Sequence, residues 1–384
     1  MTDVVIAGIG QTPVGEHMDL SLRTLAARAI QAAIRDAGGL RPQAMYIGNF
    51  LATVISRQSN LGALFTGNSG LEGIEGITVE AAGASGAAAF RMAYLAVSSG
   101  FVDVAIAVGA EKCTDVRNEE LESAMMQSVE YDYEVSSGLT LTAQAALLTR
   151  RYMHEYNLPP DGLAEFSLLA HANAVNNPNA IYRRAISPDV YHKGGMISTP
   201  LNIFDVAPYA DGAAAVILTR PDVLTKGAPQ RPVRVMGSSL ITDSLALHDR
   251  HDLLAFRAAE LSVEGACRQA GILPGDVDFF ELFDAFTIYA LLSLEAAGFA
   301  RHGEGWKLGR EGKLALGGEL PISVMGGLKG RGHPVGATGI YQIVEAVQQL
   351  RGQAGANQIP GAQRALVQSL GGAASTAVTH VLSV

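Results

Sequence analysis

His333 is the residue whose type and surroundings are best suited to chemistry in this chain of 384 residues. It lies in the glycine-rich segment GGLKGRGHPVGATG (residues 326–339), and an imidazole can donate or accept a proton near neutral pH. Two carboxylates, Glu281 and Asp284, lie upstream in ELFDAFT (residues 281–287). Burial can raise the pKa of a carboxyl group into a range useful for catalysis, although Asp284 is equally suited to bonding nearby backbone groups. These residue types predict acid–base chemistry.

Two tyrosines lie close to these segments and are further candidates for proton transfer. Tyr289 follows the DAFT of the second segment, and Tyr341 comes just after Gly339 at the end of GATG. A tyrosine in a pocket can donate or accept a proton when its surroundings shift its pKa. Both tyrosines lie in segments predicted to be helical, where packing in the core is the other interpretation.

The segment VEAAGASGAAAF (residues 79–90) is typical of a short strand that turns into a helix of small residues. A cysteine at the start of such a helix would be a good nucleophile, because the helix dipole lowers the pKa of its thiol. The residue at this turn is Gly83, which carries no nucleophile. The only two cysteines, Cys113 and Cys267, have no metal-ligand spacing, so we expect small buried hydrophobes and no metal site.

The composition is that of a compact globular protein and argues against several classes of partner. Hydrophobic residues make up 48% of the chain and charged residues 17%, with a net charge of −9 and a pI of about 5.5. This acidic balance predicts neither nucleic acid nor an anionic membrane as a partner. No apolar run reaches the roughly 18 residues that would span a bilayer, and the N-terminus lacks the basic start of a signal peptide. We therefore expect a soluble, cytoplasmic protein.

A faint internal duplication indicates how these candidate residues are positioned. An early amphipathic helix, a glycine stop and a strand recur in the same order much later, with residues 35–38 matching residues 268–271. Each copy follows a strand-like opening, at residues 4–10 and at residues 233–240. No dinucleotide-binding or Walker pattern fits the chain, so no nucleotide cofactor is expected.

Further apolar runs complete two α/β halves around an insertion. Buried strands are predicted at residues 102–110, 213–219, 364–370 and 375–384. Between about residues 116 and 205 methionines, tyrosines, charges and prolines mix, with a predicted helix at residues 141–156. We predict an N-terminal half at residues 1–115 and 206–232, an inserted domain at residues 116–205, and a C-terminal half at residues 233–384. The insertion is predicted to cover a ligand site, and a purely structural cap is the alternative.

Four segments in the expected order resemble the thiolase superfamily, in particular its archaeal-type and sterol-carrier-type branch. They are VEAAGASG, ELFDAFT, GGLKGRGHPVGATG and SLGG, the last at residues 369–372. The resemblance implies an α/β thiolase fold with two similar βαβαβαββ halves, packed as a five-layered α-β-α-β-α core with an inserted loop domain. It also implies a homodimer that acts on acyl-coenzyme A (acyl-CoA) thioesters and binds no cofactor permanently.

The resemblance further implies a site that is altered at several positions. Gly83 stands where the family has its nucleophilic cysteine, and Phe283 stands where this branch has a histidine of the oxyanion hole. His333 resembles the family histidine that activates the nucleophile and binds the thioester oxygen. Backbone N–H groups at Gly83 facing a thioester oxygen, or a pocket enlarged there, are the alternatives to tight helix packing. The predicted substrate-binding positions are Ser85, Phe283, Ser323, Gly371 and Gly372.

Three functions remain open at this point. The first is a conventional thiolase, which needs a cysteine that position 83 does not supply. The second, which we favour, makes or breaks a carbon–carbon bond without an acyl-enzyme, as in retro-aldol cleavage of a β-hydroxyacyl-CoA. It resembles the steroid side-chain aldolases, which pair with a small zinc-binding OB-fold partner. The third is a non-catalytic subunit of an acyl-transfer complex, against which the intact His333 segment counts.

Overall fold

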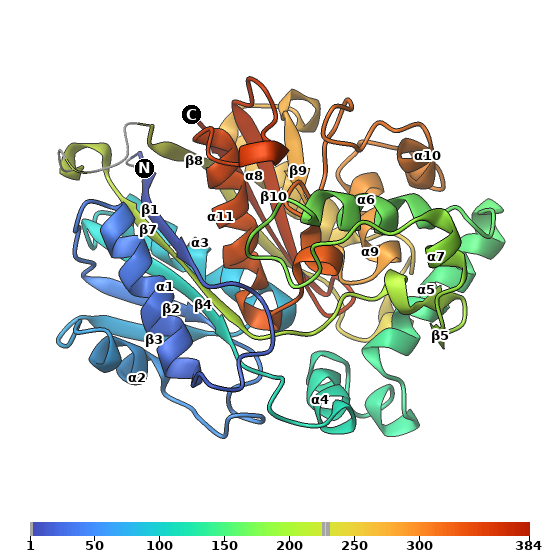
Figure 1. Ribbon diagram of the computed structural model, residues 1–384, viewed down its shortest axis with the longest axis horizontal. Helices are drawn as coiled ribbons and strands as arrows, with labels where there is room; N and C mark the ends of the chain where they lie inside the picture. The colour runs from blue at the N-terminus through green and yellow to red at the C-terminus, as the bar shows by residue number, and fades with distance from the viewer. Residues whose placement is uncertain (1–2, 225–226, 228–230) are drawn as a thin grey trace.

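A computed structural model describes residues 3–224, 227 and 231–384 of the chain. The predicted N-terminal half also includes residues 1–2, 225–226 and 228–230, which lie outside the described residues. The main sheet has nine strands in the order β3-β2-β4-β7-β1-β8-β11-β10-β9. Its first five strands come from the N-terminal half and its last four from the C-terminal half (Figure 1).

The N-terminal half follows the order β-α-β-α-β-α-β-β that the resemblance predicts. Its elements are β1 (Val5–Gln11), α1 (Leu22–Asp36), β2 (Ala44–Gly48), α2 (Leu61–Asn68), β3 (Glu75–Val79), α3 (Ser85–Ser98), β4 (Val104–Glu111) and β7 (Gly212–Thr219). Every residue of β4 and β7 is buried, as continuous apolar runs predict for central strands.

The C-terminal half repeats this order with one strand reduced. Its elements are β8 (Val233–Thr242), α8 (Arg257–Ala270), β9 (Phe279–Glu281), α9 (Thr287–Ala296), α10 (Gly305–Arg310), α11 (Thr338–Leu350), β10 (Arg364–Gly371) and β11 (Thr376–Ser383). Where the N-terminal half has β3, this half has only an isolated parallel bridge between Phe280 and Ile322. The helix of the predicted repeat ends at Gly271, whose φ of 69° suits glycine, as the glycine stop predicts.

The two halves form five layers, which confirms the predicted fold class. Helix α1 covers β1 and β7 on one outer face, and α8 covers β8 and β11 on the other. Helices α3 and α11 pack against each other and lie between the two parts of the sheet. The parts are joined because β1 pairs with β8, antiparallel, at Val5–Arg234 and Ile6–Val233.

The chain between β4 and β7 forms a largely helical segment beside the C-terminal half (Figure 1). It contains α4 (Asn118–Met125), α5 (Leu141–Tyr156), α6 (Ala164–Ala174), α7 (Pro188–His192) and a hairpin of β5 (Met196–Ser198) and β6 (Leu201–Asn202). Helix α5 coincides with the predicted helix at residues 141–156. Helix α6 packs on the glycine-rich segment at residues 327–331, which lies just before His333. The three domain boundaries stay predictions. Among the described residues, no helix is both long and apolar enough to cross a membrane.

Candidate active site

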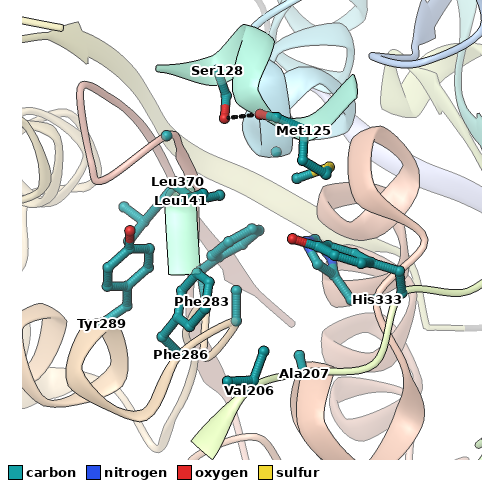
Figure 2. A pocket seen from close by; sticks show the side chains of 14 residues that line it. Met125, Ser128, Leu141, Val206, Ala207, Phe283, Phe286, Tyr289, His333 and Leu370 are labelled. Carbon is teal, nitrogen blue, oxygen red and sulfur yellow. Dashed lines mark hydrogen bonds between the residues drawn. The ribbon is translucent and has the colours of Figure 1, made fainter. Parts of the chain in front are cut away.

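A small cavity of about 20 Å³, here called the inner cavity, lies where the two halves and the inserted segment meet. Gly83 comes from the N-terminal half, Ser128 and Leu141 from the inserted segment, and His333 from the C-terminal half. Figure 2 shows His333 across this cavity from Phe286 and Tyr289. Five of the predicted site residues therefore line one cavity: Gly83, Phe283, Tyr289, His333 and Gly372.

The glycine-rich segment places His333 through backbone geometry that other residues would not tolerate. Gly332, immediately before the histidine, has a φ of 107°, and a Cβ on it would lie 2.6 Å from Cγ1 of Val14. The His333 N–H then donates to the Pro208 carbonyl at 2.9 Å, and the His333 carbonyl accepts from the Ala210 N–H at 3.2 Å. These bonds hold the histidine in a parallel bridge with Tyr209.

The imidazole of His333 is oriented by one hydrogen bond and kept neutral by its surroundings. Its Nδ1 lies 2.7 Å from Oγ1 of Thr338, the first residue of α11. Burial, and then the positive charge of Arg331, lower the pKa of His333 to about 3. Nε2 makes no hydrogen bond to any residue that the structure describes, so it is free to act on a ligand. In the tautomer whose Nδ1–H donates to Thr338, Nε2 is a proton acceptor.

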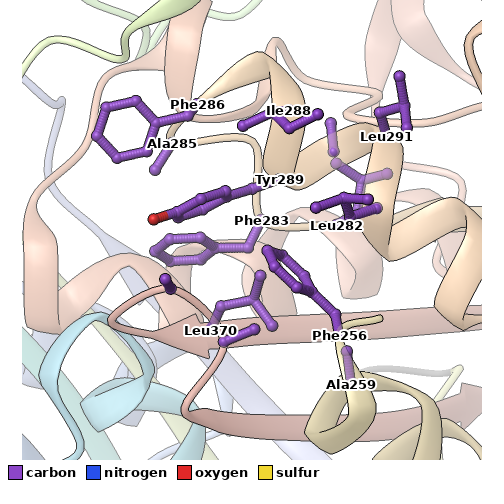
Figure 3. Close-up of a cluster of buried hydrophobic side chains, with 14 of the residues drawn as sticks. Phe256, Ala259, Leu282, Phe283, Ala285, Phe286, Ile288, Tyr289, Leu291 and Leu370 are labelled. Atoms are coloured by element: carbon purple, nitrogen blue, oxygen red, sulfur yellow. The ribbon is translucent and has the colours of Figure 1, made fainter. Parts of the chain in front are cut away.

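The ring of Phe283 fills the space beside Gly83. A Cβ on Gly83 would lie 2.8 Å from Cζ of Phe283 and 2.7 Å from the Leu370 carbonyl oxygen, closer than real Cβ contacts allow. Figure 3 shows the Phe283 ring beside that of Tyr289 and above Leu370. The same ring meets the His333 imidazole edge-on, with ring centroids 5.3 Å apart. That Gly83 is the nucleophile position stays a prediction, but the structure leaves no room for a longer side chain there.

The turn that contains Gly83 is built by its neighbours. Ala82 has a φ of 49°, an unusual conformation for a residue with a side chain. Ser85 stabilises the turn, because its hydroxyl donates to the Ala82 carbonyl at 2.7 Å and accepts from the Ala81 N–H at 2.9 Å. Ser85 does not line either cavity described here, and its contact with substrate stays a prediction.

A larger cavity of about 520 Å³, here called the outer cavity, adjoins the inner one. Three residues line both cavities: Val206, Ala207 and Tyr209. Much of the wall of the outer cavity is apolar, with Leu121, Ile186, Ile197, Ile203 and Phe204. A cavity of this size and character is typical of a small-molecule site.

Lys329 is the charged group most deeply buried in the wall of the outer cavity, with 1% of the residue exposed. Its Nζ donates to the Asp284 carbonyl oxygen at 2.8 Å and lies 3.9 Å from the Asp284 carboxylate. Burial lowers the pKa of Lys329, and the negative charges of Asp284 and Asp205 oppose that shift. The sequence interpretation missed Lys329, although it stands inside the most specific segment of the chain.

The two carboxylates predicted as acids or bases do not line the inner cavity. Asp284 accepts from the Leu328 N–H at 2.7 Å and so holds the glycine-rich turn that carries Lys329. This is the backbone-bonding alternative, and it makes Asp284 a positioning residue. Glu281 accepts from the Val324 N–H at 3.0 Å, and burial with the nearby Glu345 raises the pKa of its carboxyl group.

The two predicted tyrosines have different surroundings. Tyr289, on α9, lines the inner cavity, and its buried hydroxyl makes no hydrogen bond within the described part of the chain. Tyr341, on α11, lies outside both cavities. Its hydroxyl lies 2.9 Å from the Thr12 carbonyl oxygen and 3.0 Å from that of Ala213. These contacts favour the core-packing interpretation of Tyr341, and its catalytic role stays a prediction.

Among the other predicted contacts, only Gly372 lines the inner cavity. Gly372 has a φ of 56°, which suits glycine. Gly371 lies outside it, and a Cβ there would lie 2.4 Å from the Ala81 carbonyl oxygen, so this glycine allows backbone to pack on backbone. Ser323, with a φ of 45° and a buried hydroxyl that bonds to no described residue, also lies outside both cavities.

Neither cysteine lines the inner cavity. The thiol of Cys113 donates to the Ala210 carbonyl at 3.3 Å, and burial raises its pKa well above the ordinary value. Burial also raises the pKa of Cys267, on α8, to about 11. Both therefore remain thiols at neutral pH, as expected of small buried hydrophobes.

Tyr209 is the residue of the inner cavity that the sequence interpretation missed. It is half-buried, it lines both cavities, and its ring centroid lies 5.8 Å from that of His333. It stands in VAPYADG, just before the apolar run of β7, and no spacing rule singles it out. Only the bridge between Tyr209 and His333 brings it to the site.

Models of two thiolase domains match almost the whole chain. The thiolase N-terminal domain matches residues 4–197, and the thiolase C-terminal domain-like family matches residues 239–384. The chain belongs to the thiolase family. It is an enzyme of the thiolase type, related to acyltransferases that act on acyl-CoA.

Similar proteins cover nearly the full length. The acetyl-CoA acetyltransferase of Methanothermobacter thermautotrophicus is 38% identical over 100% of both chains. The benzoylsuccinyl-CoA thiolase subunit BbsB of Thauera aromatica is 33% identical over 94% of this thiolase-family chain and 91% of its own. A solved structure of an Ltp2-ChsH2(DUF35) aldolase superposes with a TM-score of 0.86 and 25% identity, over 100% of this chain and 98% of the other. The similarity thus extends to both acyltransferases and an aldolase.

Proposed function

We propose that this protein makes or breaks a carbon–carbon bond of an acyl-CoA thioester without forming an acyl-enzyme. The favoured reaction is retro-aldol cleavage of a β-hydroxyacyl-CoA. One observation carries this proposal: the Phe283 ring occupies the space that a side chain at position 83 would need, while His333 stays at the cavity. That packing disfavours a reaction through a nucleophilic side chain at position 83, whereas it leaves proton transfer by His333 possible.

Retro-aldol cleavage needs no covalent intermediate. A base takes the proton of the β-hydroxyl group, whose O–H electron pair becomes the new C=O bond. The Cα–Cβ bond breaks, and its electron pair moves to Cα and the thioester oxygen as an enolate. The base then returns the proton to Cα, so that an aldehyde or ketone and a shortened acyl-CoA are the only products.

His333 is the proposed base, with Nε2 facing the substrate. Its lowered pKa keeps it neutral in the free enzyme, as a proton acceptor must be. The imidazolium forms only as the enolate forms, so that a pair of opposite charges replaces an isolated buried charge. Tyr289, whose buried hydroxyl has no partner among the described residues, is a second group able to exchange or share a proton there.

The outer cavity is the proposed site of the CoA thioester. Its 520 Å³ is ample for the pantetheine arm, and it reaches the inner cavity at Val206, Ala207 and Tyr209. Lys329 supplies a buried donor for a polar group of that arm. No permanently bound cofactor is part of this proposal.

A small zinc-binding OB-fold protein is the proposed partner. The similarity to a solved Ltp2-ChsH2(DUF35) aldolase, at 25% identity over the full chain, supports an aldolase that works together with a second protein. A homodimer and a cytoplasmic location remain predictions from the resemblance and the composition. Coexpression with neighbouring small open reading frames, followed by size-exclusion chromatography, tests for the partner.

Product analysis tests the proposed reaction. The purified protein, alone and with its genomic-neighbour partner, is incubated with β-hydroxyacyl-CoA thioesters of increasing chain size, and released aldehyde or ketone and shortened acyl-CoA are measured. We expect equal amounts of the two products, and loss of the reaction in His333→Ala. Absence of cleavage for every thioester, with and without the partner, would refute the proposal.

A conventional acetyl-CoA acetyltransferase is the second candidate, because a relative of 38% identity bears that name. It predicts a free-CoA-dependent thiolysis and a covalent acyl group on the protein, which retro-aldol cleavage does not. A non-catalytic subunit of an acyl-transfer complex is the third candidate. It predicts that His333→Ala leaves the activity of the assembled complex unchanged.

A further inference from the structure

Tyr209 stands at the boundary between the two cavities and lines both. We infer that its hydroxyl group is a catalytic group that donates a hydrogen bond to the thioester oxygen while His333 takes the β-hydroxyl proton. This inference rests on the proposed retro-aldol function and deepens it. It assigns the donor that Phe283 cannot supply, because a phenylalanine ring has no hydrogen-bonding atom.

The backbone fixes the Tyr209 and His333 side chains next to each other. The two residues are partners in a parallel bridge, closed by the bonds from the His333 N–H to Pro208 and from the Ala210 N–H to His333. Side chains of residues directly paired in this way project to the same face. Their rings accordingly lie 5.8 Å apart at an angle of 35°. A substrate that reaches His333 from the outer cavity passes the residues that line both cavities, which are Val206, Ala207 and Tyr209.

The hydroxyl of the half-buried Tyr209 makes no hydrogen bond to a described residue, whereas the hydroxyls of two buried tyrosines do. Tyr152 donates to Glu295 at 2.5 Å, and Tyr191 donates to Asp205 at 2.9 Å. Hydroxyl groups inside a folded protein normally find such partners. A phenol that is left without one, in the wall of a cavity, is suited to bonding a ligand.

The protonation state of Tyr209 fits a donor and not a base. Burial, and then the negative charge of Glu122, raise the pKa of its hydroxyl well above the ordinary value. The phenol therefore keeps its proton at neutral pH and can donate to an oxygen on which negative charge develops. The Tyr209 proton is not transferred, so the bonds made and broken are those of the retro-aldol reaction. One C–C bond breaks, one C=O bond forms, and the β-hydroxyl proton moves to His333 and then to Cα.

Tyr209→Phe is the direct test, with Tyr94→Phe as the matched control. Tyr94, on α3, is buried outside both cavities, so its substitution makes the same chemical change away from the site. For Tyr209→Phe we expect kcat to fall by about 10²–10³-fold, the cost of removing one oxyanion donor, with KM within about threefold of the wild-type value. Calorimetric titration with coenzyme A should give an unchanged Kd. Retention of more than half of the wild-type kcat overturns the inference.

A second variant keeps the inference testable if Tyr209→Phe is poorly folded. Incorporation of 3,5-difluorotyrosine at position 209 keeps the ring and the hydroxyl but makes the phenol more acidic. We expect activity to fall with rising pH at a lower pH than in the wild type, because the donor form is lost earlier. An unchanged basic limb overturns the inference. If the wild type cleaves no β-hydroxyacyl-CoA, the proposed function fails; if it cleaves and both Tyr209 variants behave as wild type, only the role of Tyr209 fails.

Discussion

Adding a single methyl group at position 83 should destabilise the protein, and shortening Phe283 should relieve part of that cost. In Gly83→Ala the new Cβ would lie 2.8 Å from Cζ of Phe283 and 2.7 Å from the Leu370 carbonyl oxygen. Gly83 is not among the glycines with a positive φ, so backbone strain does not add to the effect. Phe283→Leu removes the end of the ring, whereas the Leu370 carbonyl belongs to β10 and cannot move far.

The expected size of the effect follows from the two close contacts. Overfilling a packed core costs about 1–3 kcal/mol. An unfolding entropy of about 2.1 cal/mol/K per residue gives about 0.8 kcal/mol/K for 384 residues, so Tm should fall by about 1–4 °C. Because one of the two contacts remains in the double variant, Phe283→Leu should recover roughly half of this cost, a coupling of about 1 kcal/mol.

The coupling is measured by thermal unfolding of four proteins at one protein concentration and one scan rate. They are the wild type, Gly83→Ala, Phe283→Leu and the double variant. Gly67→Ala is the control, because a Cβ on Gly67 meets nothing within 4 Å and this glycine lies in α2. It should be neutral or stabilise by up to about 1 kcal/mol, since alanine favours helix. If the effects of Gly83→Ala and Phe283→Leu add within about 0.5 kcal/mol, the steric argument is wrong.

Three further predictions concern the chemistry of the site. The wild type should show no acyl adduct by intact mass after incubation with acetyl-CoA, because both cysteines are buried thiols with raised pKa values. The double variant Gly83→Cys/Phe283→His should gain one acyl group. An adduct on Cys113 of the wild type would contradict this prediction. The kcat/KM should not fall between pH 7 and pH 5, because a pKa of His333 lowered to about 3 keeps the imidazole neutral there; an acid limb near the ordinary value of 6.5 would argue against it. Tyr341→Phe should lower the free energy of unfolding by about 1–3 kcal/mol with kcat unchanged, since two carbonyls lose a buried donor. Urea unfolding and steady-state kinetics measure the two effects. A large fall in kcat at unchanged stability would instead support a catalytic role for Tyr341.

The layered fold could be predicted, and His333 could be singled out as a candidate, because their signals are local in the sequence. Strands such as β4 are continuous apolar runs, and helices such as α5 show helical spacing, so each is read from its own residues. The segment around His333 also stands out in the sequence, and three of its glycines, Gly326, Gly327 and Gly332, have a positive φ that suits glycine. Gly332, for example, is required by its φ of 107°.

The residues that the sequence interpretation missed, and those whose polar atoms are bound by other groups, depend on contacts between distant parts of the chain. Tyr209 becomes a site residue only through its bridge with His333, and nothing in its own segment marks it. Tyr341 has the right residue type near the right segment, but its hydroxyl bonds to the carbonyls of Thr12, just after β1, and Ala213, in β7. The Asp284 carboxylate likewise accepts a hydrogen bond from the Leu328 N–H. Such hydrogen bonds determine which polar atoms remain available to a ligand, and they cannot be inferred from the sequence alone.

The polar side chains of the inner cavity are suited to proton transfer and hydrogen bonding. Among the described residues that line it, the only polar side chains are Ser128, Tyr209, Tyr289 and His333. Ser128 is the one alcohol that resembles a nucleophile, yet its hydroxyl donates to the Met125 carbonyl at 2.8 Å (Figure 2). A nucleophilic serine needs a base to take its proton, and Ser128 has no hydrogen bond to His333. The remaining groups are a neutral imidazole and two phenols, a set that can move a proton and donate hydrogen bonds to a developing enolate, as the proposed reaction requires.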